Sequence, residues 1–171
     1  FAGCVLFLNN TANSWDGPTL IPSGTLRLGA SGVVPDGSAV SLTGGNFDLN
    51  GFSETVAAIT LNSSSSTISG AGTLTATNYD LRAGTCSAVL AGSGVSATKA
   101  TTGSVDLTGA NSFSGGFNFN AGTVRVNSPN ALGANGAPVT VANGVTLSTT
   151  TSTARSLTNA WTLNGNITLG Q

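Results

Sequence analysis

The chain has little charge and neither histidine nor methionine. Only 6% of its 171 residues are charged, against roughly 25% in a typical soluble domain. Five Lys and Arg residues and a net charge of -1 cannot neutralise a run of phosphates, which argues against nucleic-acid partners. With no histidine and two cysteines, Ser-His and Cys-His catalytic pairs and the usual zinc and haem sites are unavailable. We therefore expect no catalytic, cofactor-binding or metal-binding residues, and no cofactor.

Long hydrophobic runs are also missing. No apolar stretch approaches the length that a membrane-spanning helix needs, so we expect no membrane insertion of this segment. Residues 1–8 are apolar but lack a basic region and a small-residue cleavage site, so they predict a strand, not a signal peptide. Residues 167–171 are strand-like as well, and we expect the chain to be cut from something longer. The hydrophobic content of 39% with low charge argues against disorder.

The pattern of side chains predicts strands and turns without helices. Short apolar bursts alternate with polar residues, and no stretch repeats at i, i+3, i+4, i+7 over a helical length. Between the bursts stand doublets that tolerate positive φ: Asp16-Gly17, Asp36-Gly37, Asn50-Gly51, Asn135-Gly136, Asn143-Gly144 and Asn164-Gly165. The expected fold class is all-β.

The bursts recur about every 21 residues, which is typical of stacked repeats. In the first half, the two series are Val5/Phe7, Leu26/Leu28, Phe47/Leu49 and Thr19/Ile21, Val40/Leu42, Ile59/Leu61. In the second half, they are Val105/Leu107, Val124/Val126, Val145/Leu147, Ile167/Leu169 and Phe117/Phe119, Val139/Val141, Trp161/Leu163. Each step predicts one coil of a β-solenoid, and about eight coils at the ~4.8 Å strand spacing would make a rod roughly 38 Å long.

A second period of about 98 to 100 residues relates the two halves of the chain. Residues 13–17 (NSWDG) correspond to 111–115 (NSFSG), and residues 23–28 (SGTLRL) correspond to 121–126 (AGTVRV). We interpret residues 1–171 as one continuous β-helix segment, with internal modules 3–61 and 103–169. The two modules are joined by looser coils at 62–102, whose polar runs still contain strand-like apolar positions.

The second module resembles the passenger-associated transport repeat of bacterial autotransporters. The resemblance lies in residues 103–116 (GSVDLTGANSFSGG), 120–126 (NAGTVRV) and 131–133 (ALG). The first copy, residues 3–37, departs from it by Pro18 in place of Gly116, by Trp15 as the aromatic residue, and by two extra residues before Asn13. The spacer around 88–94 is similar to the family's inter-repeat segment.

This resemblance implies a right-handed parallel β-helix in a passenger that is secreted or displayed on the bacterial cell surface. In the family, the repeats are associated with export through the outer membrane, with a signal peptide upstream and a translocating β-barrel downstream. The repeat brings no known catalytic residues to this chain. We therefore expect no enzyme activity.

Charged residues are predicted to pair between neighbouring coils. Arg27 lies one coil from Asp48, and Asp106 lies one coil from Arg125, at outward positions. We interpret these as exposed ion pairs worth about 0 to 1 kcal/mol each. A lyase-like or hydrolytic site would need clustered carboxylates, whereas the six acids are scattered: Asp16, Asp36, Asp48, Glu54, Asp80 and Asp106.

The cysteines and the large aromatic residues each allow two interpretations. Alternation places Cys86 inward with Ala88 and Leu90, and Cys4 on the face opposite Val5 and Phe7, so we expect two free thiols in preference to a disulfide. We expect the large aromatic side chains at positions 15, 113 and 161 to pack in the core or at a corner, and we favour this over a role as exposed platforms on which sugars stack. Threonine clusters at 73–77 and 148–151 suggest an ice-binding face, but threonine is not found at one outward position on coil after coil.

Together these patterns favour a structural or adhesive extracellular stalk or filament segment. Its expected partners are neighbouring β-helix coils or copies of itself placed end to end, because an uncapped coil exposes unpaired backbone groups. Cell-surface or matrix glycans are a further candidate partner. A carbohydrate-active, lyase-like β-helix enzyme and a glycan-binding module stay open as alternatives.

Overall fold

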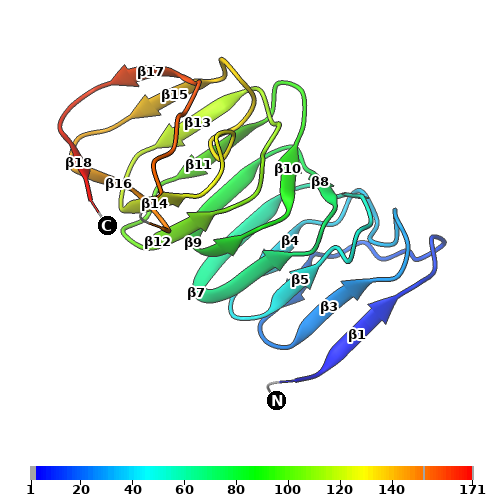
Figure 1. Ribbon diagram of the computed structural model, residues 1–171. Coiled ribbons are helices and arrows are strands. Elements are labelled where there is room, and N and C mark those ends of the chain that lie inside the picture. Colours follow the sequence, from blue (N-terminus) through cyan, green and yellow to red (C-terminus); the bar gives the residue numbers. More distant parts are fainter. Residues whose placement is uncertain (1–2, 152, 171) are drawn as a thin grey trace.

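The strands stack in parallel along one axis (Figure 1). The computed structural model describes residues 3–151 and 153–170, so residues 1–2 and 171 of the two predicted terminal strands lie outside the described residues. None of the described residues is helical, and so none forms a helix that could cross a membrane. The chain winds through about eight coils. This confirms the predicted all-β parallel solenoid.

Two long columns of strands form the main faces of the rod. The first column contains β1 (Val5–Leu8), β3 (Thr25–Leu28), β5 (Asn46–Asp48), β7 (Ile59–Ser69), β9 (Tyr79–Cys86), β12 (Ser104–Leu107), β14 (Thr123–Val126), β16 (Val145–Thr149) and β18 (Ile167–Leu169). The second contains β2 (Thr19–Ile21), β4 (Val40–Leu42), the first halves of β7 and β9, β11 (Ser96–Lys99), β13 (Gly116–Phe119), β15 (Pro138–Val141) and β17 (Ala160–Leu163). A short third column contains β6 (Glu54–Thr55), β8 (Thr73–Thr75) and β10 (Val89–Ala91).

Residues about one coil apart sit on top of one another, as the period predicts. Leu26 pairs with Phe47, and Phe47 pairs with Ile68, at equal steps along the sequence. Along the first column the step is shorter between Ile68 and Cys86 and longer between Val126 and Thr149. Because each coil keeps its strands in place, the differences in length are taken up by the connecting loops.

Two predicted pairings are wrong in detail. Leu6 and Leu8, not Val5 and Phe7, lie over Leu26 and Leu28. The run VLFL is apolar at every position, so alternation does not choose its inward face, and packing on β3 decides it.

The second correction concerns the coil after β14. Val124 pairs with Leu147, not with Val145, so this coil is longer than the period predicts. The loop between β14 and β15 holds the additional residues, and a shift of two positions keeps the same face inward.

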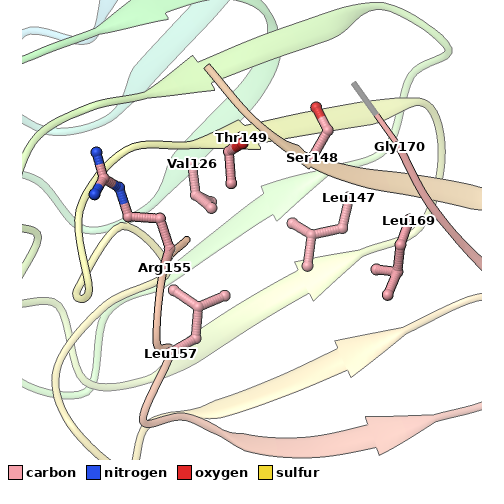
Figure 2. Close-up of a pocket in the computed structure, with 8 residues that line it drawn as sticks. All are labelled: Val126, Leu147, Ser148, Thr149, Arg155, Leu157, Leu169 and Gly170. Atoms are coloured by element: carbon pink, nitrogen blue, oxygen red, sulfur yellow. The ribbon is translucent and has the colours of Figure 1, made fainter. Parts of the chain in front are cut away.

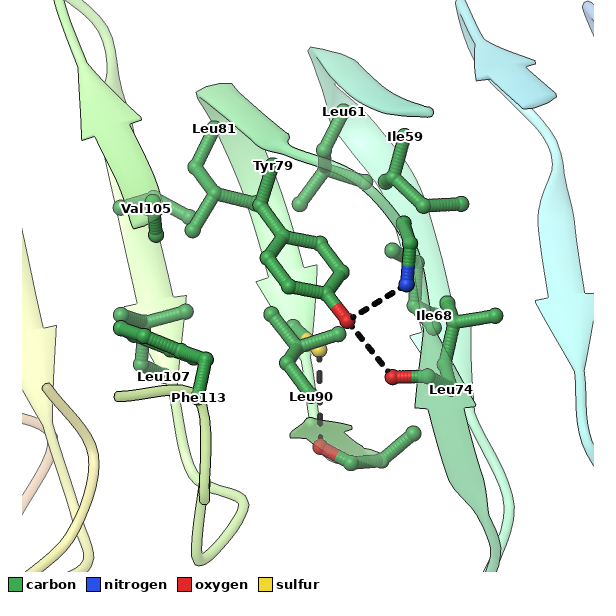
Figure 3. Packing of buried hydrophobic residues seen from close by; sticks show 14 of the residues in the cluster. Ile59, Leu61, Ile68, Leu74, Tyr79, Leu81, Leu90, Val105, Leu107 and Phe113 are labelled. Atoms are coloured by element: carbon green, nitrogen blue, oxygen red, sulfur yellow. Dashed lines mark hydrogen bonds between the residues drawn. The ribbon is translucent and has the colours of Figure 1, made fainter. Parts of the chain in front are cut away.

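The interior is a continuous stack of aliphatic and aromatic side chains (Figure 3). Ile59, Leu61 and Leu81 are fully buried, and Tyr79 is 1% exposed. The hydroxyl of Tyr79 shares its single proton between two backbone carbonyl oxygens, at 2.6 Å and 2.7 Å, and accepts from the backbone N–H of Ala76 at 3.1 Å. The hydroxyl of Tyr79 therefore supplies hydrogen-bond partners to backbone groups that would otherwise be buried without them.

Residues 62–102 contribute strands to all three columns. The bend of β9 passes close to β7 at Gly84, where φ is +126° and an added Cβ would lie 2.6 Å from the carbonyl oxygen of Ser66. Only glycine fits this close approach without strain. The core thus runs through this stretch from one end of the rod to the other.

Candidate functional site

The acidic residues are dispersed over the coils. Asp16 and Asp36 are exposed, and the other four acids have separate surroundings. The described residues contain no group of three or more His, Cys, Asp or Glu that could hold a metal ion. No side-chain arrangement among the described residues thus supports the lyase-like alternative, which would need clustered carboxylates.

Both predicted ion pairs between coils form. Arg27 Nε lies 2.7 Å from Asp48 Oδ2. Arg125 binds Asp106 with two nitrogens, at 2.5 Å and 3.0 Å, in a bidentate geometry. The aspartates are less exposed than predicted, since the side chain of Asp48 is 11% exposed and that of Asp106 is 21%.

Two contacts around these pairs were not predicted. Arg82 lies 2.7 Å from Asp80 on the same strand. Arg27 lies over the ring of Phe7 at 5.5 Å, because the true register of β1 places Phe7 outward beside it. The contact of Arg27 with Phe7 joins adjacent coils, whereas the pair of Arg82 and Asp80 lies within one strand.

The asparagine of the repeat motif bridges successive coils from inside a corner. Asn111 accepts a hydrogen bond from the backbone N–H of Leu90 at 2.9 Å and donates to the carbonyl oxygen of Ala131 at 2.7 Å. In the first module, Asn13 donates in the same way to the carbonyl oxygen of Val33 at 3.0 Å. The motif asparagine therefore links neighbouring coils by hydrogen bonds at a corner, where the chain turns and the regular hydrogen bonds between strands are interrupted.

A buried carboxylate occupies the corresponding corner two coils after Asn13. Glu54 is 2% exposed. Its Oε2 accepts from the backbone N–H groups of Val33 at 3.0 Å and Val34 at 3.2 Å, and its Oε1 accepts from that of Thr55 at 3.1 Å. Burial raises the pKa of Glu54, against the lowering effect of these three N–H groups. Nothing in the spacing of Glu54 distinguishes it from a solvated acid, so the sequence did not single it out.

Lys99 is the second buried charge that the sequence did not indicate. It is fully buried. Its Nζ donates to the carbonyl oxygens of Thr101 and Ala121 and to the hydroxyl of Thr101. Burial lowers the pKa of Lys99 to about 8, and the charge of Asp80 acts in the opposite direction. Like Asn111, this side chain satisfies backbone groups on two coils, in this case two carbonyl oxygens.

The aromatic residues pack as predicted. Phe113 is fully buried and its ring centroid lies 5.9 Å from that of Tyr79. Trp15 is partly buried against the core and donates from Nε1 to the hydroxyls of Thr19 and Ser38. Trp161 also packs against the core. None of the three stands out as a free sugar-stacking platform.

Both cysteines are free, as expected, although the reason given for Cys4 is wrong. The register of β1 puts Cys4 on the side of Leu6 and Leu8, not opposite the inward side chains. Cys4 is exposed because it lies on the open first coil, where it lines a hollow with Leu6 and Leu26. Cys86 is buried, and burial raises its thiol pKa to about 12.

One outward column of polar side chains extends along the second strand column. Its register runs from β4 to β17, one residue per coil: Ser41, Thr60, Asp80, Thr98, Asn118, Thr140 and Thr162. We call this set the polar column. The threonines are in register, which the sequence did not reveal, but Asp80 and Asn118 interrupt them, so threonine does not line this column from end to end.

Comparison with known proteins gives two matches. The family profile described as the passenger-associated-transport-repeat matches residues 5–28 and 98–126. These two ranges contain both motif asparagines and both paired arginines of the modules. Over 131 residues the chain is 36% identical to the Adhesin BmaC autotransporter of Brucella suis biovar 1 (strain 1330), an alignment covering 76% of this chain and 4% of that protein. The chain thus spans a small part of that relative's length. No solved structure matches.

Proposed function

We propose, from the premise that this chain is an autotransporter passenger segment with passenger-associated transport repeats, that it is a length of extracellular stalk in a surface adhesin. The observation that carries this proposal is the unbroken stack of parallel strands from β1 to β18. Each coil contacts its neighbours, so stability is a sum of nearest-neighbour terms and the rod can extend without a large core.

Display at the bacterial cell surface is supported by the similarity to an autotransporter adhesin. The rod suits that setting, because coils can form one after another on those already outside the cell. No catalytic role is proposed, since the side chains that are unusually buried, such as Glu54, Lys99 and Asn111, are engaged with backbone groups.

We assign adhesion to the polar column. Its hydroxyl and amide groups lie on one face at the spacing of successive strands, and it extends over most of the rod. Such groups both donate and accept hydrogen bonds, as sugar hydroxyls do. The partner we propose is therefore a glycan of a host cell surface or matrix, laid along the rod.

Adhesion is tested with beads that carry the purified chain, in flow over epithelial cells. Wild-type beads should be retained more than bare beads, and enzymatic removal of cell-surface glycans should abolish the difference. The triple variant T60K/T98K/T140K should also abolish it.

A matched control places the same charges on the other main face. Ser104, Thr123 and Thr146 form an outward series along the first strand column, and S104K/T123K/T146K should leave retention unchanged. Equal loss with both variants would show that added charge, not the polar column, determines binding. Wild-type beads that bind no better than bare beads would refute adhesion.

A further inference from the structure

The polar groups that a sugar could bind lie on the outer faces of the rod. A hollow of about 330 Å³ at the C-terminal coil has a largely aliphatic lining, which includes Val126, Leu147, Leu157 and Leu169 (Figure 2). Leu147 and Leu157 pack against the interior stack. A ligand rich in hydroxyl groups would leave most of them without partners in such a hollow. The polar column is therefore the better surface for a glycan.

An ion pair lies near the middle of the polar column. Asp80 is a member of the column, and Arg82 lies two positions further along β9. Both point outward, because Leu81 between them is fully buried. Arg82 Nε donates to Asp80 Oδ2 at 2.7 Å, and the two side chains are 44% and 31% exposed. The pair is thus open to solvent on the face to which we assign adhesion.

The geometry of this pair leaves three polar atoms available. Asp80 Oδ1 and the two terminal nitrogens of Arg82 make no hydrogen bond to another described residue. The side chain of Arg125 is similarly exposed, at 43%, but it binds Asp106 through two nitrogens. Arg27 lies over the ring of Phe7. Of these three arginines, only Arg82 has terminal nitrogens with neither a hydrogen bond to the described residues nor a ring beside them.

A β-bulge sets the position of Arg82. Strands β7 and β9 pair Leu61 with Leu81 and then Asn62 with Ala83, so Arg82 is the additional residue. Among the described strand pairs, register shifts occur between β7 and β9 alone. A bulge re-aims a side chain, and bulges are over-represented beside active sites. The irregular part of the sheet therefore coincides with the charged part of the polar column.

The available atoms match two neighbouring hydroxyls of one sugar ring. One hydroxyl donates to Asp80 Oδ1, and the hydroxyl on the adjacent carbon accepts from Arg82. Thr60 and Thr98 lie one strand away on either side of Asp80, and their hydroxyls make no hydrogen bond to the described residues. A carboxylated sugar fits less well, because the available oxygen of Asp80 would repel it. The pair thus favours a neutral ring.

We propose that Asp80 and Arg82 form the central subsite of the polar column and determine its specificity. The ligand is a neutral sugar with two free hydroxyls on adjacent carbons, and Thr60 and Thr98 bind the neighbouring sugars of the same glycan. This inference rests on the proposed adhesion, and it adds the chemistry that the glycan must present.

Binding of the fluorescently labelled chain to fixed epithelial cells, measured by flow cytometry, tests the subsite. D80A and R82A should each raise the apparent Kd about tenfold, which corresponds to the loss of one hydrogen bond to a charged group. The matched controls D106A and R125A remove the same groups from the ion pair on the first strand column. They should bind like the wild type, and circular dichroism should show all four variants folded.

Two treatments of the cells identify the sugar. Periodate cleaves the bond between carbons that carry adjacent hydroxyls, so oxidation followed by borohydride reduction should abolish binding of the wild type. Sialidase removes acidic terminal sugars and should leave binding unchanged.

D80A and R82A variants that bind like the wild type, while T60K/T98K/T140K still abolishes retention, would overturn the subsite and leave adhesion standing. Equal weakening by D106A and R125A would also overturn it, because charge alone would then explain the loss. Tighter binding by D80A, or loss of binding after sialidase, would indicate an acidic ligand and contradict the proposal. A wild type that does not bind the cells would refute adhesion itself, and the subsite with it.

Discussion

Replacement of the motif asparagine should destabilise the rod far more than replacement of an outward asparagine. In Asn111→Ala, the backbone N–H of Leu90 and the carbonyl oxygen of Ala131 both lose their partner. Asn111 is 1% exposed, so water does not replace the side chain without opening the corner. A buried backbone group left unpaired costs about 1–3 kcal/mol. Two such groups predict a loss of about 2–6 kcal/mol in the free energy of unfolding.

Two other asparagines give graded comparisons. Asn13 makes one hydrogen bond to the next coil, to Val33, so Asn13→Ala should cost about half as much. Asn118 lies outward on β13 and makes no side-chain hydrogen bond to the described residues, so Asn118→Ala should stay within about 0.5 kcal/mol of the wild type.

Urea unfolding followed by circular dichroism measures all three variants. Amide hydrogen exchange locates the loss, which should be greatest at Leu90 if the bridge acts locally. A loss below about 1 kcal/mol for Asn111→Ala, or an equal loss for Asn118→Ala, would show that the motif asparagine does not hold the coils together.

Three further predictions concern titratable groups. A thiol reagent should modify Cys4 in the native protein and Cys86 only after unfolding, because Cys86 is buried with a pKa of about 12; mass spectrometry that finds Cys86 modified first would contradict this. Lys99 binds fewer protons in the folded state than in the unfolded state between about pH 8 and its ordinary value of roughly 10.4. The free energy of unfolding from this group should therefore rise with pH across that window; K99M should flatten the rise, and an unchanged profile would exclude Lys99 as its source. Glu54 has a raised pKa, so the folded state binds more protons and the stability contributed by this group should fall as pH increases from about 4. E54Q should lack this fall in urea titrations at successive pH values, and a wild-type profile that rises relative to E54Q would reverse the assignment.

The sequence was sufficient for the architecture because the period and the alternation are local signals that every coil repeats. Leu26, Phe47 and Ile68 recur at equal steps, so stacking them on one axis buries them all. The motif residues Asn111 and Phe113 were recognisable because they recur in the first module as Asn13 and Trp15. The pairing of Arg27 with Asp48 followed directly from the step of one coil.

The tertiary structure decided the features that depend on contacts with neighbouring coils, because a local sequence pattern does not specify those contacts. The inward face of β1 was set by packing on β3, because four consecutive apolar residues carry no alternation. The polar column emerged only when loops of unequal length brought residues separated by irregular steps into register. Glu54 and Lys99 look like surface charges in the sequence, and only the folded corner shows their backbone partners. Repetition along the chain fixed the winding, whereas the burial of each polar group was settled by the coils above and below it.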